Sequence, residues 1–119
     1  MNIEEYRNYC LAKKGVTEEF PFNEIALVFK VMGKMFALID VEKFDSISLK
    51  CNPERGVTLR EEYAGINYAY HFNKKHWIGM ATDGSVPKSL MYELINHSYE
   101  LVVSKLPKKI KQELENYEK

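Results

Sequence analysis

One apolar stretch decides the fold: residues 25–41, which read IALVFKVMGKMFALIDV. Every second residue from Ile25 to Val31 falls on one face, and this period of two predicts a β-strand. Met32-Gly33-Lys34 is a short link consistent with a hairpin. Met35–Val41 is nearly all apolar, which predicts a second strand that is central in its sheet or covered on both faces.

The rest of the chain predicts three more strands and at least three helices. The first helix begins after Asn2, a good N-terminal cap, and Gly15 stops it. The expected strands are Ile25–Val31, Met35–Val41, Ser46–Cys51, Tyr68–Phe72 and Trp77–Ala81. The expected later helices are Pro53–Glu62, a long one after Pro87 that Pro107 ends or kinks, and a polar helix or tail over residues 108–119.

This order, α-β3-α-β2-α, contains no run of β-α-β units. A mainly antiparallel five-stranded sheet packed with helices is therefore the natural architecture, in the α+β class. Val16–Asn23, which contains Pro21, is expected to be a loop. A length of 119 residues without linkers or repeats predicts one domain over residues 1–119.

Composition narrows the classes of function. The 17 basic and 17 acidic residues give a net charge of zero, which argues against a non-specific nucleic-acid binder. The acidic N-terminus lacks the features of a signal peptide, and no apolar run is long enough to span a bilayer. We therefore expect a cytoplasmic protein without membrane contact, with Cys10 and Cys51 as buried, reduced thiols.

No catalytic or cofactor motif is found in the sequence. The three histidines lie in different settings without the spacing of a zinc site, so we expect no metal and no cofactor. Cys51 falls on the inward phase of its strand, which favours a buried thiol over a nucleophile. The acidic pairs fit helix starts and loops, and no glycine-rich phosphate cradle is present. We expect a protein that is not an enzyme.

The unusual run is residues 71–77, which read HFNKKHW. It combines imidazole, amide, ammonium and indole groups at the tip of an expected hairpin. A basic hairpin can reach a phosphate backbone while an aromatic ring packs beside it. The alternative is a solvated hairpin that Trp77 anchors in the core. On the long helix, Tyr92 and Tyr99 share a face, which indicates the edge of the core more than a ligand site.

Several segments resemble the MmcQ/YjbR family. They are Val16 with Pro21-Phe22, residues 28–31 and 33–38, Leu49-Lys50 with Pro53-Glu54, residues 71–77, Asp83-Gly84, Val86-Pro87 and Ser98-Tyr99. The resemblance runs from Tyr6 to Leu106, and its most specific part is the element His-x-Asn-Lys-x-His-Trp. Lys14 and Tyr68 depart from it, since the family usually has proline at both positions.

The resemblance implies a fold similar to type III secretion chaperones and a regulatory DNA-binding role in which two β-hairpins, a "double wing", grip duplex DNA. The two wings would be the hairpin at Gly33-Lys34 and the one at residues 73–76. The residues implied in DNA contact are Lys34, Lys50, Asn73, Lys74, Lys75 and His76. With no net charge, this role requires the four lysines to share one face.

Two alternative functions remain open. The first is a protein-binding module, like a secretion chaperone, that uses an apolar face or groove of the sheet. The second is a small-molecule binder in which His71, His76, Trp77 and Tyr99, beside Ser98 of the same family motif, converge on one pocket. In each case we expect a monomer or a weak dimer.

Overall fold

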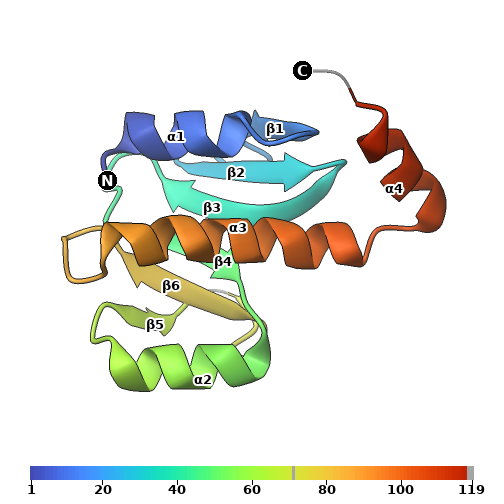
Figure 1. Cartoon of the computed structure of the whole chain (residues 1–119). Helices are drawn as coiled ribbons and strands as arrows, with labels where there is room; N and C mark the ends of the chain where they lie inside the picture. Colours follow the sequence, from blue (N-terminus) through green and yellow to red (C-terminus); the bar gives the residue numbers. More distant parts are fainter. Residues whose placement is uncertain (71, 118–119) are drawn as a thin grey trace.

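The computed structural model describes residues 1–70 and 72–117 (Figure 1). Within these residues the chain forms six strands and four helices. The strands are β1 (Val16–Glu19), β2 (Ala26–Val31), β3 (Lys34–Asp40), β4 (Ser46–Lys50), β5 (Ile66–Tyr68) and β6 (Trp77–Ala81). The helices are α1 (Ile3–Leu11), α2 (Pro53–Glu62), α3 (Lys88–Ser104) and α4 (Lys108–Glu115).

All six strands belong to one antiparallel sheet in the order β1-β2-β3-β4-β6-β5. The α+β class and the antiparallel sheet are therefore confirmed, and β3 is central as its apolar sequence predicts. Met32 and Gly33 form the two-residue turn between β2 and β3, with φ of 49° and 84°. Positive φ at both positions is the geometry of the tight hairpin turns that match strand twist.

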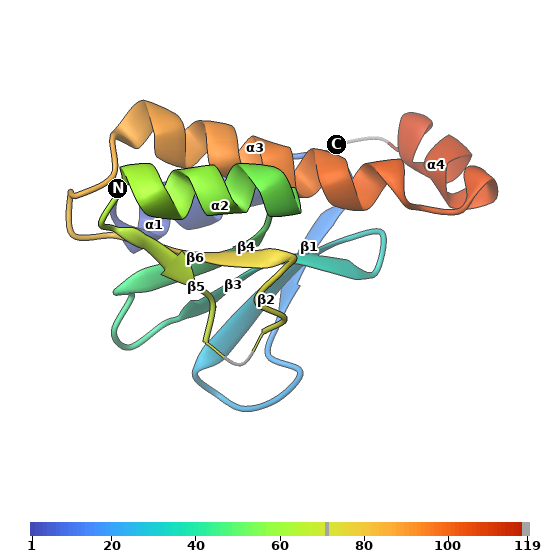
Figure 2. The same ribbon diagram turned by 90° about the horizontal axis from the view of Figure 1, so that it is seen from below.

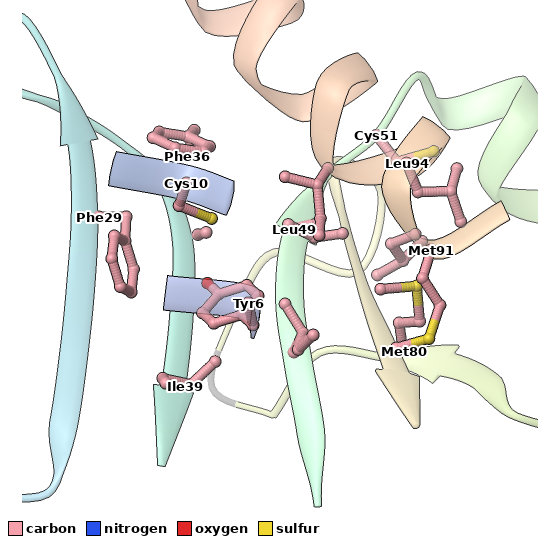
Figure 3. Packing of buried hydrophobic residues seen from close by; sticks show 14 of the residues in the cluster. Tyr6, Cys10, Phe29, Phe36, Ile39, Leu49, Cys51, Met80, Met91 and Leu94 are labelled. Atoms are coloured by element: carbon pink, nitrogen blue, oxygen red, sulfur yellow. The ribbon is translucent and has the colours of Figure 1, made fainter. Parts of the chain in front are cut away.

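The sheet has one covered face and one open face. Helices α1, α2 and α3 all lie on the same side of it, and no described helix lies on the other side (Figure 2). The core forms between the sheet and this helical layer, where Tyr6 of α1 packs edge-on against Phe29 at a ring-centroid distance of 5.3 Å (Figure 3). Alternation along β4 places Ile47 and Leu49 in this core and leaves Ser46 and Ser48 on the open face.

Local sequence explains where α1 and α2 begin. The Asn2 side chain accepts a hydrogen bond from the Glu5 amide, and the Asn52 side chain accepts bonds from the amides of Glu54 and Arg55. These caps satisfy amides that no helical carbonyl can reach. The predicted polar C-terminal helix is present as α4.

Both cysteines are buried and free, as the sequence predicts. Cys10 is on the α1 face that meets the sheet, and burial raises the pKa of its thiol to about 12. Burial also raises the pKa of Cys51. These thiols therefore act as small apolar core groups.

The prediction of five strands is wrong, because residues 16–19 form β1 and are not part of a loop. Val16 lies opposite Val31 and is buried, so pairing with the β2 edge holds this short segment extended. Pro21 comes after the strand ends and does not interrupt its hydrogen bonds.

The fourth predicted strand, Tyr68–Phe72, is displaced: the observed β5 is Ile66–Tyr68. Ile66 lies opposite Met80 and is buried, which fixes the register. The described residues between β5 and β6, which are 69–70 and 72–76, are not part of any strand. Their tyrosine and phenylalanine resemble strand residues because aromatic side chains are common in strands.

In the described part of the chain, no helix has both the length and the apolar character needed to cross a membrane.

Candidate binding sites

Three lysines meet at one end of the sheet, which we call the lysine end and define as Lys34, Lys50 and Lys105. Because β3 and β4 are antiparallel, the start of β3 and the end of β4 lie at the same end of the sheet. The C-terminus of α3 lies at this end too (Figure 1). The three side chains line a hollow of about 410 Å³ together with Trp77.

A second hollow, of about 370 Å³, adjoins the first because both include Lys50, Trp77 and Lys105. It also includes Asn73 and His76. Lys50 is directly opposite Trp77 in the sheet, and its ammonium is 6.0 Å from the centre of the indole ring. The structure therefore brings together five of the predicted residues: Lys34, Lys50, Asn73, His76 and Trp77.

Ser98 holds the Lys50 backbone in place from the covered side. Its hydroxyl accepts a hydrogen bond from the Lys50 amide at 2.9 Å and donates one to the Phe36 carbonyl at 2.6 Å, and the residue is fully buried. One helical side chain thus links β3 to β4. Ser98 is a positioning residue beneath the lysine end.

His97 supports the neighbouring turn. Its Nε2 accepts a hydrogen bond from the Asn52 amide at 3.2 Å, next to the start of α2. Burial, and then the nearby Arg55 guanidinium, lower the pKa of His97 because both disfavour the charged imidazolium. The neutral ring that accepts this bond is therefore the favoured form.

The loop that carries Asn73 is tied to the sheet. The Asn73 side-chain oxygen accepts hydrogen bonds from the amides of Lys75 and His76 at 2.8 and 3.2 Å. Phe72 stacks on Trp77 with ring centroids 4.2 Å apart and planes 21° from parallel. Residues 73–76 therefore lie in the connection between the antiparallel strands β5 and β6, and these contacts fold them back toward Trp77.

The other predicted residues lie elsewhere. Lys74 has its ammonium 5.7 Å from the centre of the Tyr68 ring on the edge strand β5, and Arg60 is at 4.3 Å on that ring. Lys75 is exposed in the loop. Tyr99 donates a hydrogen bond to the Lys14 carbonyl at 2.6 Å. His71 lies outside the described residues.

The lysines at the two ends of the sheet differ in their ion pairing. Among the described residues, no ion pair involves Lys34, Lys50 or Lys105, whereas Lys88 pairs with Glu5 at 2.7 Å. The opposite end of the strands carries Asp40, Asp45 and Asp83 together with Lys43 and Lys88. Beyond the lysine end, α4 carries both basic and acidic side chains: Lys108, Lys109, Lys111, Glu113 and Glu115.

A larger hollow, of about 720 Å³, lies on the open face, and the sequence-based reasoning missed it. Phe22 and Phe72 are on its walls, and Leu38 and Ser48 are on its floor. The alternation of Ser46 and Ser48 predicts an outward polar face but gives no sign that two loops enclose it. The available signal was Phe22, a large aromatic residue in a segment that is not part of a strand.

Comparison with known proteins identifies the family. The YjbR family model matches residues 11–101. The chain belongs to the YjbR family. It is 36% identical to the uncharacterised protein YjbR of Escherichia coli K12 over 108 residues, which are 90% of this chain and 92% of that protein. It is 29% identical to the YyaQ protein of Bacillus subtilis over 98 residues, 82% and 79% of the two chains.

Solved YjbR-like structures agree with the fold. A crystal structure of a Deinococcus radiodurans protein, described as a DUF419 domain, superposes with a TM-score of 0.90 at 39% identity and covers 95% of this chain and 87% of its own. A crystal structure of a Pseudomonas syringae protein superposes with a TM-score of 0.72 at 30% identity. The match covers 85% of this chain and 98% of that one. The matched YjbR region contains Lys34, Lys50 and residues 71–77 but not α4.

Proposed function

We propose that this YjbR-family protein binds double-stranded DNA through the lysine end. The observation that supports the proposal is the convergence of Lys34, Lys50 and Lys105, without ion-pair partners among the described residues, around two adjoining hollows. Lysines that neutralise backbone phosphates release condensed counterions and supply most of the affinity for DNA. A local cluster can do this even though the chain is neutral overall.

This site differs from the two-hairpin model of DNA binding that the family resemblance implies. The β2–β3 hairpin still supplies Lys34, and the β5–β6 loop supplies Asn73 and His76 beside Lys50. Polar side chains of this kind bind phosphate or reach base edges. Trp77 is 7% exposed and covered by Phe72, so it supports the site and does not stack on a base.

Fluorescence anisotropy with a labelled DNA duplex over a range of salt concentrations tests the proposal. Three phosphate contacts predict a slope of about −3 for log affinity against log salt. The triple variant Lys34→Ala/Lys50→Ala/Lys105→Ala should lose nearly all of this binding and its salt dependence. Wild type and triple variant with equal affinities would show that the lysine end does not bind DNA.

A charge-matched control distinguishes a loss of local contacts from an effect of net charge on DNA binding. Arg7→Ala/Lys43→Ala/Lys88→Ala removes the same charge from α1, the β3–β4 turn and the start of α3, and it should keep the wild-type slope. Arg7 and Lys88 are in exposed ion pairs, whose loss costs little stability. A further variant, Lys74→Ala/Lys75→Ala, should lose less affinity than the lysine-end triple. A larger loss would move the contact surface to the β5 edge.

A further inference from the structure

The hollow on the open face has the size and boundaries of a ligand pocket. Figure 2 shows the loops that precede β2 and β6 extending from the sheet on the side away from the helices. The volume between them, about 720 Å³, is lined from both loops and from the sheet floor. Pockets for small organic ligands commonly have volumes in this range.

Its walls expose aromatic surface to water. Phe22 is 68% exposed and Tyr70 is 83% exposed, and Phe72 also lines the hollow. Folding gains little from leaving large apolar side chains in water. Their grouping around one hollow therefore indicates a surface that contacts an apolar ligand.

The few polar groups of the hollow are available for binding. The hydroxyls of Ser46 and Ser48 have no hydrogen-bond partner within the described part of the protein. Asp40, Lys43 and Asp45 line one end. One oxygen of Asp40 accepts the amides of Glu42 and Lys43, whereas the Asp45 carboxylate has no such partner there. Two carboxylates against one ammonium give this end a net negative charge.

We propose that this hollow is a binding site for a small aromatic molecule that carries a positive charge. The ring system packs between Phe22 and Phe72 over Leu38, the cationic group lies toward Asp45, and the Ser46 and Ser48 hydroxyls bond to polar atoms of the ligand. Aromatic faces and a carboxylate both favour a cation, since the ring quadrupole and the negative charge attract it. The site is separate from the lysine end and does not depend on DNA binding.

The position of the hollow favours a small molecule over an extended peptide. Its floor is formed by β2, β3 and β4, each of which is paired with a strand on both sides. Their backbone groups are therefore satisfied, and a peptide on this face could not add to the sheet as a strand does at a free edge.

Thioflavin T, a cationic aromatic dye that fluoresces when its rings are held, is a direct probe, and 8-anilinonaphthalene-1-sulfonate is its anionic counterpart. We expect saturable binding of thioflavin T with one site per chain and weaker binding of the anionic dye. Phe22→Ala should weaken thioflavin T binding about three- to tenfold through the lost ring contact. Asp45→Asn should weaken it severalfold and reduce its salt dependence.

Two controls accompany these variants. Phe20→Ala removes an exposed ring from the same loop that does not line the hollow, and it should bind as wild type does. The lysine-end triple variant should also keep thioflavin T binding, which distinguishes failure of this proposal from failure of the DNA proposal. Tighter binding of the anionic dye, or no effect of Phe22→Ala, would overturn the assignment.

Competition identifies the class of occupant. Displacement of thioflavin T by benzyltrimethylammonium supports a small cation. Displacement only by an unfolded model polypeptide, such as reduced carboxymethylated α-lactalbumin, would show that the face binds protein segments instead. Loss of dye binding as protein concentration rises, with dimers in sedimentation velocity, would assign the face to a second copy of the chain. Either of these outcomes overturns the proposal.

Discussion

The two faces of the sheet differ in how far their large aromatic side chains are exposed to solvent. On the covered face, Phe29 and Phe36 are fully buried under the helices. On the open face, Phe22 and Tyr70 are mostly exposed on the loops around a hollow. Burial of apolar surface stabilises a fold, and exposed apolar surface does not. The covered face therefore maintains the structure, and the open face is free to bind a ligand.

Side chains of α3 support the lysine end from the covered face. Ser98 and His97 of α3 reach the backbone of residues 50 and 52 from the covered side. Lys50 lines both hollows at the strand ends, and Lys34 lines one of them. The helical layer thus supplies both the core and the support of the polar site.

The largest effect is expected for a truncation in the covered face. Phe36→Ala removes a fully buried ring that packs edge-on against Tyr99 at 5.6 Å. A cavity of this kind costs about 3–5 kcal/mol of unfolding free energy, which urea unfolding followed by circular dichroism measures. Phe36→Leu, which fills most of the space, should cost much less. A loss below about 1 kcal/mol for Phe36→Ala would contradict the division between the faces.

A smaller effect is expected for the buried hydroxyl. Ser98→Ala leaves the Lys50 amide and the Phe36 carbonyl without their partner, which costs about 1–3 kcal/mol. Ser104→Ala is the matched control on the same helix, because the Ser104 hydroxyl bonds only to the nearby Leu101 carbonyl and is exposed. Equal unfolding midpoints for the two variants in urea would show that Ser98 does not link β3 to β4.

Much of the covered face is predictable because its signals are local. Alternation from Ile25 to Val31, the caps at Asn2 and Asn52, and the apolar run of β3 each follow from a few neighbouring residues. The predicted bounds of α2 and β6 agree with the structure. The strand β1 was missed because its extended form depends on pairing with β2, which a short sequence such as Val-Thr-Glu-Glu does not reveal.

The candidate sites are less predictable because they depend on tertiary placement. Residues 71–77 contain the family motif, but the sequence could not show that Phe72 folds back onto Trp77 or that Lys74 lies by Tyr68. Lys105 joins Lys34 and Lys50 only because α3 ends above the strand ends. The open-face hollow depends on two loops that are distant in the sequence.

A pH-dependent effect is expected where the helical layer supports the turn before α2. The lowered pKa of His97 means that the unfolded chain binds a proton more readily than the folded one. The contribution of His97 to the free energy of unfolding is fully present above the ordinary histidine pKa of about 6.5. It is lost as the pH falls through the lower pKa that His97 has in the folded protein.

Urea unfolding at about pH 7.5 and pH 5.5 measures this effect, and we expect wild type to lose about 0.5–1 kcal/mol because the unfolded chain takes up a proton that the neutral His97, bonded to the Asn52 amide, resists. His97→Gln, whose side chain cannot titrate, should lose less between the same two pH values. If the two proteins lose the same stability, carboxylate groups and not His97 cause the change.

The smallest effect on stability is expected on the open face. Phe22→Ala removes as many atoms as Phe36→Ala, but the ring is 68% exposed and leaves no cavity behind. We therefore expect the unfolding free energy to change by no more than about 0.5 kcal/mol, while thioflavin T binding weakens. A loss comparable to that of Phe36→Ala would mean that Phe22 is part of the core, and the distinction between a structural face and a binding face would then not hold.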